Sequence, residues 1–183
     1  MTTYCALLRG IGPGNPNMHN DKLRDVFSAL GFANVSSVLA SGNIIFTDRT
    51  GADVAELEAQ IQAALQQDLS IGGGTILRSR EELETLVATD PFEGMEHAKP
   101  TYLTVTFLKV PLDPAPEPFP SPELPAMEVR GYNPGARAIL AVTDTTAART
   151  PDFMGWLERQ FGKDMTTRTW LTVHRILKRM REA

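Results

Sequence analysis

The amino-acid sequence predicts an α+β fold, because short apolar runs alternate with segments whose apolar residues recur at helical spacing. Over residues 1–79 the order of these elements is strand, helix, strand, strand, helix, strand. That order is typical of the split βαβ, or ferredoxin-like, sandwich, in which both helices cover one face of an antiparallel sheet. Hydrophobic residues make up 42% of the chain and charged residues 22%, as in globular proteins that bury a core.

The first elements each have a local signal. The apolar run 3–8 predicts a buried strand, and the β-rich segments 35–39 and 43–47 flank Ala40-Ser41-Gly42, which predicts a hairpin turn. Between them lies a helix with Gly31 just past its end, where glycine adopts a left-handed cap without strain. Its apolar residues lie at i, i+3, i+4 and i+7: Leu23, Val26, Phe27 and Leu30.

A second amphipathic helix and a strand complete the first half. The helix carries an apolar stripe formed by Val54, Leu57, Ile61 and Leu65. Three glycines at 72–74 then break the chain, and residues 75–78 resume as a strand. We therefore place a first, ferredoxin-like domain at residues 1–79.

Residues 80–183 predict a second, smaller α+β half. Ser79 with Glu82 has the pattern of a capping box, so a helix begins there and ends near Asp90-Pro91. Residues 102–109 are the clearest β-run of the chain, and residues 127–130 and 137–142 predict a hairpin. The intervening residues 111–125 contain seven prolines, which predicts an extended surface excursion outside the core.

The second half ends in two predicted helices. Thr150 followed by Pro151 is typical of a helix start, and this helix continues to a stop at Gly162. The last helix has one apolar stripe: Trp170, Val173, Ile176, Leu177 and Met180.

Composition and charge exclude several classes of protein. No apolar run approaches the roughly 20 residues of a membrane helix, and the first residues lack the pattern of a secretory signal. The single cysteine fits a reducing cytoplasm, where we expect the protein to reside. The net charge of −4 disfavours nucleic acid as a general partner. Residues 163–183, however, hold six basic and two acidic residues, which indicates a solvated helix face or a surface that binds an acidic group.

The loop at residues 9–17 lies between a predicted strand and a predicted helix, a context that suits anion binding by backbone N–H groups. It matches neither a dinucleotide fingerprint nor a phosphate-binding loop ending in Gly-Lys-Ser/Thr, and its two prolines remove N–H donors. The alternative is a constrained turn whose asparagines cap the helix.

Two further polar segments have a structural and a functional interpretation. Ser41-Gly42-Asn43 lies at a hairpin tip, where serine and asparagine either form the turn or bind a ligand. Residues 166–170 are expected to open the last helix, and their threonines either cap it or, with Arg168, hold a carboxylate or phosphate.

No metal or catalytic motif is present. His19, His97 and His174 are isolated from one another and from the single cysteine, so no metal site is expected. Cys5 lies in the first apolar strand and is expected to be a buried thiol. No acid–base pair or nucleophile stands out, so the catalytic residues are unknown, no cofactor is expected, and enzymatic activity is left open.

Three segments in order resemble a bacterial family, domain-of-unknown-function family 1697. They are residues 6–11 (ALLRGI), residues 30–32 with 41–46 (LGF and SGNIIF), and residues 166–173 (TTRTWLTV). The resemblance implies a cytoplasmic α+β protein of two related ferredoxin-like halves, without an established activity. The family's recurrent polar positions correspond to Arg9, Ser41, Asn43, Thr167 and Arg168. The sequence departs from the family at residues 12–17 and at Thr169, where many members have an asparagine.

The leading functional hypothesis is a polar pocket that binds a small anionic ligand. Arg9 and Arg168 supply charge, while Ser41, Asn43 and Thr167 supply directional hydrogen bonds. One alternative is an interaction module in which residues 111–125 and the basic last helix dock a protein or RNA partner. Another is an enzyme of unknown reaction that uses the same pocket.

Overall fold

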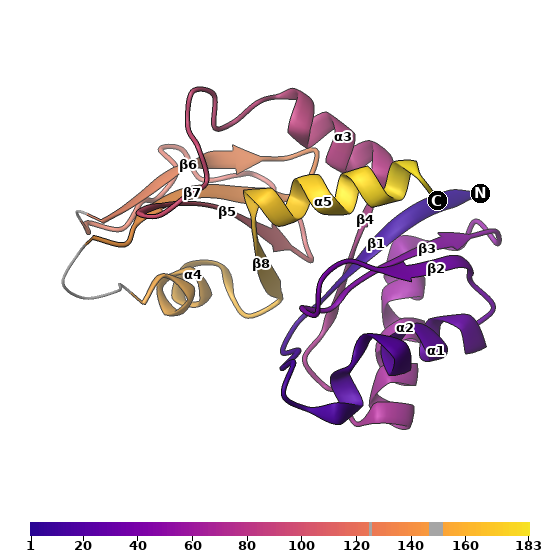
Figure 1. Cartoon of the computed structure of the whole chain (residues 1–183). Coiled ribbons are helices and arrows are strands. Elements are labelled where there is room, and N and C mark those ends of the chain that lie inside the picture. Colours follow the sequence, from indigo (N-terminus) through magenta and orange to yellow (C-terminus); the bar gives the residue numbers. More distant parts are fainter. Residues whose placement is uncertain (125, 147–151) are drawn as a thin grey trace. The chain divides into compact units, whose positions relative to one another are not determined.

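A computed structural model describes residues 1–124, 126–146 and 152–183. The described residues form five α-helices and two four-stranded antiparallel sheets, so the expected α+β class is confirmed (Figure 1). The chain forms two compact units: unit 1 consists of residues 1–83 and 175–183, and unit 2 of residues 84–174. In the described part of the chain, no helix is both long and apolar enough to cross a membrane.

The sheet of unit 1 has the strand order β2-β3-β1-β4, with every neighbouring pair antiparallel. Its strands are β1 (Thr2–Leu8), β2 (Ala33–Ser37), β3 (Asn43–Asp48) and β4 (Thr75–Ser79). The predicted strands all form, and their bounds move by two residues at most. The two central strands, β1 and β3, are almost entirely buried.

Two helices cover one face of this sheet, α1 (Asn20–Ala29) and α2 (Val54–Leu69), with a short 3-10 turn, η1 (Pro16–Met18), ahead of α1 (Figure 1). The predicted apolar stripes of both helices pack on Tyr4, Ala6 and Leu8 of β1 and on Phe46 of β3. Phe27, Phe32 and Phe46 form a ring cluster with centroid separations of 4.4–6.1 Å. The hydrophobic periodicity of the sequence is therefore the main determinant of this core.

Helix α2 also completes the hydrogen bonding of β4, the last strand of the sheet. The buried carboxylate of Glu58 accepts a hydrogen bond from the backbone N–H of Leu77 at 2.9 Å. Gln62, one turn further along α2, accepts from the Thr75 hydroxyl at 3.0 Å. The first contact satisfies a backbone N–H of an edge strand, and the second pairs a buried hydroxyl.

The sheet of unit 2 has the order β6-β7-β5-β8 and is also antiparallel. Its strands are β5 (Thr101–Leu108), β6 (Met127–Asn133), β7 (Ala138–Asp144) and β8 (Met165–Thr169). The helices of the second half are α3 (Arg80–Ala88), α4 (Phe153–Phe161) and α5 (Trp170–Arg181). Residues 80–83 of α3 and 175–181 of α5 belong to unit 1. The predicted capping box of α3 is confirmed by reciprocal bonds between Ser79 and Glu82 at 2.7 and 3.2 Å.

The start of the last helix differs from expectation. Residues 166–169 were expected at a helix N-terminus, but they belong to β8, and α5 begins at Trp170. Threonine is β-branched and suits a strand when a partner strand is present, and β5 provides that partner. Thr169 caps α5 by accepting a hydrogen bond from the Thr172 N–H at 3.2 Å. The two C-terminal helices are thus separated by a strand that the sequence analysis missed.

The predicted start of α4 at Thr150-Pro151 lies outside the described residues. Within them, Asp152 is the N-cap, and its carboxylate accepts a hydrogen bond from the Gly155 N–H at 2.9 Å. The helix stops at Gly162, as predicted.

Between β5 and β6, where unit 1 has α1 between its first two strands, unit 2 has a proline-rich segment. We call residues 111–124, the described part of the predicted excursion, the proline arm; it contains no helix or strand. It is not only a surface excursion, because Leu112 and Phe119 pack against the apolar core of unit 2. The Phe119 ring lies between Tyr132 and Phe161, with centroid separations of 6.0 and 5.5 Å.

Candidate functional site

Three loops meet at one end of the unit 1 sheet. The N–H of Leu8, the last residue of β1, donates to the carbonyl oxygen of Gly42 at 2.8 Å. The next N–H along the chain, that of Arg9, donates to the carbonyl oxygen of Gly74 at 2.9 Å. We call the place where residues 9–12, 38–42 and 72–74 come together the loop junction.

Two glycines make this close approach possible. A Cβ at Gly42, whose φ is +74°, would lie 2.5 Å from Cγ1 of Ile11 and 3.0 Å from Cβ of Leu8. A Cβ at Gly73 would overlap the carbonyl group of Arg9. The loop junction therefore requires glycine at both positions, and the backbone of Arg9 is held by the packing around it.

Ser41 and Asn43 hold the turn between β2 and β3. The Asn43 side chain is fully buried, and its Nδ2 donates to the Val38 carbonyl oxygen at 2.9 Å and to the Ser41 Oγ at 3.0 Å. Ser41 itself is exposed. The turn-forming role weighed in the sequence analysis is thus present for Asn43.

The structure brings Arg9, Ser41 and Asn43 together at the loop junction of unit 1. Arg9 is half-buried and directly follows β1, and it precedes Gly10, which has a φ of +74°. An arginine in this position has a fixed backbone and a long side chain that ends in a guanidinium group. This group suits binding of a carboxylate or phosphate.

Thr167 and Arg168 are consecutive residues of β8 in unit 2, so their side chains point to opposite faces of the sheet. The Thr167 Oγ1 is 2.8 Å from the Thr106 Oγ1 on β5, and it donates to the Met154 sulfur at 3.1 Å. The Arg168 guanidinium, which is half-buried, donates from Nη1 to the Thr166 hydroxyl at 2.7 Å and to the Thr167 carbonyl oxygen at 2.9 Å. These bonds orient the guanidinium along the strand.

The sequence matches the family described as "Protein of unknown function (DUF1697)" over residues 1–123. The chain belongs to this family. The matched residues include the whole loop junction and end within the proline arm, while Thr167 and Arg168 lie beyond them. The resemblance stated from sequence is thereby confirmed.

A comparison with solved structures gives the fold independently. The structure of the conserved bacterial protein SP0830 from Streptococcus pneumoniae is similar over 99% of this chain and 99% of that chain, with a TM-score of 0.78. The two sequences are 21% identical, so the likeness shows a common fold. A comparison with curated proteins found no match.

Two carboxyl groups in turns and one tyrosine in β1 of this DUF1697 protein have displaced pKa values. Burial raises the pKa of the Asp48 carboxyl, but hydrogen bonds from Thr50 and Gly51 outweigh it, and the pKa lies below its ordinary value. Bonds from the backbone and hydroxyl of Thr146 lower the pKa of Asp144 in the same way. Burial raises the pKa of the Tyr4 hydroxyl.

The expected character of the cysteine is confirmed: Cys5 is fully buried in β1. His97 accepts a hydrogen bond on Nδ1 from the Leu103 N–H at 3.0 Å, and the His174 ring stands edge-on to Trp170. Within the described ranges, no group of three histidine, cysteine or acidic side chains has the arrangement of a metal site.

The sequence analysis missed Arg78 on β4, which is the bulkiest fully buried side chain of the described residues. Its Nη1 donates to the carbonyl oxygen of Leu77. A signal was present, because the junction Arg78-Ser79 before α3 repeats as Arg168-Thr169 before α5. An arginine and a hydroxyl-bearing cap thus end the last strand of both sheets.

Proposed function

We propose that this protein binds a small anionic ligand, and that Arg9 at the loop junction carries the main charge of that site. The observation that supports the proposal is the pair of adjacent backbone bonds, Leu8 to Gly42 and Arg9 to Gly74. They fix the chain immediately before a guanidinium-bearing side chain, so less freedom is lost when an anion binds. A carboxylate or phosphate accepts two parallel hydrogen bonds from such a group.

In this proposal Ser41 and Asn43 act together. The exposed Ser41 hydroxyl provides a hydrogen bond to the anion, and buried Asn43 positions it through the 3.0 Å contact with its Oγ. Asn43 is then a positioning residue, whose loss also loosens the turn through the Val38 carbonyl.

The proposal extends to Thr167 and Arg168 of unit 2. The bonds from Arg168 to Thr166 and Thr167 orient its guanidinium. An oriented guanidinium loses less entropy when it binds an anion than a freely rotating one does. We propose that Thr167 and Arg168 bind a small anion within unit 2 as well.

The experiment is a thermal-shift screen with inorganic phosphate, nucleotides, sugar phosphates and dicarboxylic acids. A ligand at about 100 times its dissociation constant stabilises the folded state by about 2.7 kcal/mol, which is an easily measured shift. Arg9→Ala and Arg168→Ala should each reduce the shift. Arg49→Ala, an exposed arginine just after β3, is the matched control and should retain it. If no anion shifts the transition, or if Arg49→Ala behaves like Arg9→Ala, the proposal is wrong.

We also infer that both halves, residues 1–79 and 80–183, are variants of one split βαβ, ferredoxin-like plan. The support is the matching strand order of the two sheets, β2-β3-β1-β4 and β6-β7-β5-β8. In the second half the proline arm takes the place of the first helix in the chain order.

A second candidate function is docking of a protein partner through the proline arm. The observation that favours it is that residues 113–118 are exposed although Leu112 and Phe119 anchor the arm at both sides. Deleting the arm would expose the core of unit 2, so substitution of exposed residues is the appropriate test. Replacing Pro114 and Pro116 by alanine should reduce the capture of a partner from a cell extract, and an unchanged set of captured proteins would contradict this function.

A further inference from the structure

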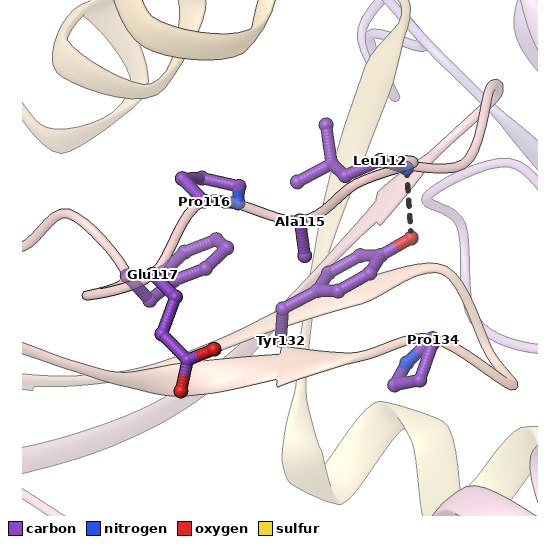
Figure 2. A pocket seen from close by; sticks show the side chains of 7 residues that line it. Leu112, Ala115, Pro116, Glu117, Tyr132 and Pro134 are labelled. Carbon is purple, nitrogen blue, oxygen red and sulfur yellow. Dashed lines mark hydrogen bonds between the residues drawn. The ribbon is translucent and has the colours of Figure 1, made fainter.

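A cavity of about 430 Å³ lies in unit 2 between the proline arm and the β6–β7 hairpin (Figure 2). The arm contributes Leu112, Ala115, Pro116 and Glu117, and the opposite wall contains Tyr132 and Pro134. This volume lies within the range of about 300–1,000 Å³ that is usual for sites of small molecules.

Contacts at both ends tie the proline arm to unit 2. The Tyr132 hydroxyl accepts a hydrogen bond from the Leu112 N–H at 3.1 Å, which ties the arm to β6 (Figure 2). Phe119, which also lines the cavity, lies nearly parallel to Tyr132, with an interplanar angle of 1°, and its ring is also stacked on Phe161. Further along the arm, the Ser121 hydroxyl accepts from the Val129 N–H at 3.2 Å. The arm is therefore held at Leu112, Phe119 and Ser121, on either side of the residues that line the cavity, which limits the entropy lost on binding.

The lining is mostly apolar, and its one charged side chain is the carboxylate of Glu117. Pro116 and Pro134 have no backbone N–H, so these two residues offer a ligand no backbone donors. The proline arm itself contains three acidic residues and no lysine or arginine. The residues that line the cavity offer a cation a carboxylate and aromatic rings, and include no positive side chain.

We propose that this cavity binds a small organic cation, namely an ammonium group attached to an aromatic or branched apolar body. The ammonium group donates to the Glu117 carboxylate, and the apolar body packs against Leu112, Pro116 and Tyr132. The charge of this ligand is opposite to that of the ligand proposed for Arg9, and the site lies entirely within unit 2. A failure of one proposal therefore does not contradict the other.

The test uses 2-phenylethylammonium as the probe, followed by the backbone amide NMR signals of the whole protein. We expect saturable shifts of the Ala115, Glu117 and Tyr132 signals, and no such shifts with 3-phenylpropionate, which has a carboxylate in place of the ammonium group. Glu117→Gln should weaken binding of the cation about two- to fivefold, the usual value of an exposed charge pair. Glu123→Gln, which removes an acidic residue of the same arm outside the cavity, is the matched control.

A second variant tests the cavity itself. Ala115→Leu places a larger apolar side chain at an exposed arm position that lines the cavity, so folding should be retained and binding should be lost. Binding of 3-phenylpropionate as strong as that of the cation, or equal affinity in the Glu117→Gln and Glu123→Gln variants, would overturn the proposal. The absence of any shift with the cation would overturn it as well.

Discussion

Arg78 and Arg168 occupy the same register position in the two sheets. Arg78 on β4 lies opposite Cys5 of β1, which in turn lies opposite Ile45 of β3. Arg168 on β8 lies opposite Val105 of β5, which lies opposite Leu140 of β7. The environments of the two arginines nevertheless differ, because Arg78 is fully buried whereas Arg168 is half-buried.

This difference predicts unequal effects on stability. Arg78→Ala should lower the free energy of unfolding by about 3 kcal/mol, since it removes a large buried side chain and the hydrogen bonds of a charged group. Arg168→Ala should cost only about 1 kcal/mol, as is usual for a partly exposed residue. Urea unfolding of both variants measures the two values. Equal losses would show that the burial of Arg78 has no energetic consequence.

The loop junction predicts a steric effect at Gly73. Gly73→Ala should destabilise the protein by about 1–3 kcal/mol, because the new methyl group meets the Arg9 carbonyl and the backbone must move. Gly14→Ala is the matched control, since a Cβ there has no neighbour within 4 Å, and it should change stability by about 0.5 kcal/mol at most. Thermal or urea unfolding provides the comparison. A neutral Gly73→Ala would mean that the loops are free to separate.

Asn43→Ala should cost about 1–3 kcal/mol, because it removes two hydrogen bonds of a fully buried side chain and leaves the Val38 carbonyl without its amide donor. Ser41→Ala, at the exposed partner, should cost less. The measurement is again the free energy of unfolding, combined with the affinity for any anion found in the screen. A Ser41→Ala variant that loses more stability than Asn43→Ala would contradict the roles assigned to this turn.

The Asp48 carboxylate predicts a dependence of stability on pH. Although burial opposes ionisation, the hydrogen bonds from Thr50 and Gly51 hold its pKa below the ordinary value in the folded state. The stabilisation from Asp48 is therefore present above the unfolded pKa of about 3.9 and is lost as the pH falls through the lower folded pKa. The stability difference between the wild type and Asp48→Asn should be full near about pH 7 and shrink on acidification below about pH 4. A difference that stays constant over this range would disprove the assignment.

The proline arm is anchored by the aromatic ring of Phe119, so removal of this ring should lower the stability of unit 2. Phe119→Ala should destabilise unit 2 by about 2 kcal/mol, less than for a fully buried phenylalanine, because the ring is partly exposed. Loss of its stacking on Tyr132 and Phe161 should also change the near-ultraviolet circular dichroism. Glu123→Ala, an exposed change in the same arm, should alter neither measurement. Unchanged dichroism in Phe119→Ala would indicate that the stacked arrangement does not persist in solution.

Local patterns were enough to predict the elements of unit 1. The stripes on α1 and α2 and the runs in β1 and β3 have the period of their structures, so they could be read without knowing what they contact. The capping box of Ser79 and Glu82 was predicted for the same reason, since both of its bonds join residues close in sequence.

Features that depend on distant partners were not predicted. Residues 166–169 were assigned to a helix start because their partner strand, β5, lies more than fifty residues earlier in the sequence. No local pattern reveals such a pairing. Phe119 was placed outside the core because a proline-rich context indicates an extended segment, whereas its stacking on Phe161 comes from the fold. At the candidate site, the meeting of Arg9 with Gly73 and Gly74 was equally invisible, since nothing in either loop specifies the other.

Unit 1 consists of two segments that lie far apart in the sequence, and this affects its folding during synthesis. Residues 1–83 and 175–183 belong to the same compact unit, and the later segment carries Ile176, Leu177 and Met180, which are buried. A ribosome therefore synthesises all of unit 2 before it delivers the segment that completes unit 1. Until then the nascent unit 1 lacks these apolar side chains, and we expect it to depend on chaperones more than unit 2, whose residues are contiguous.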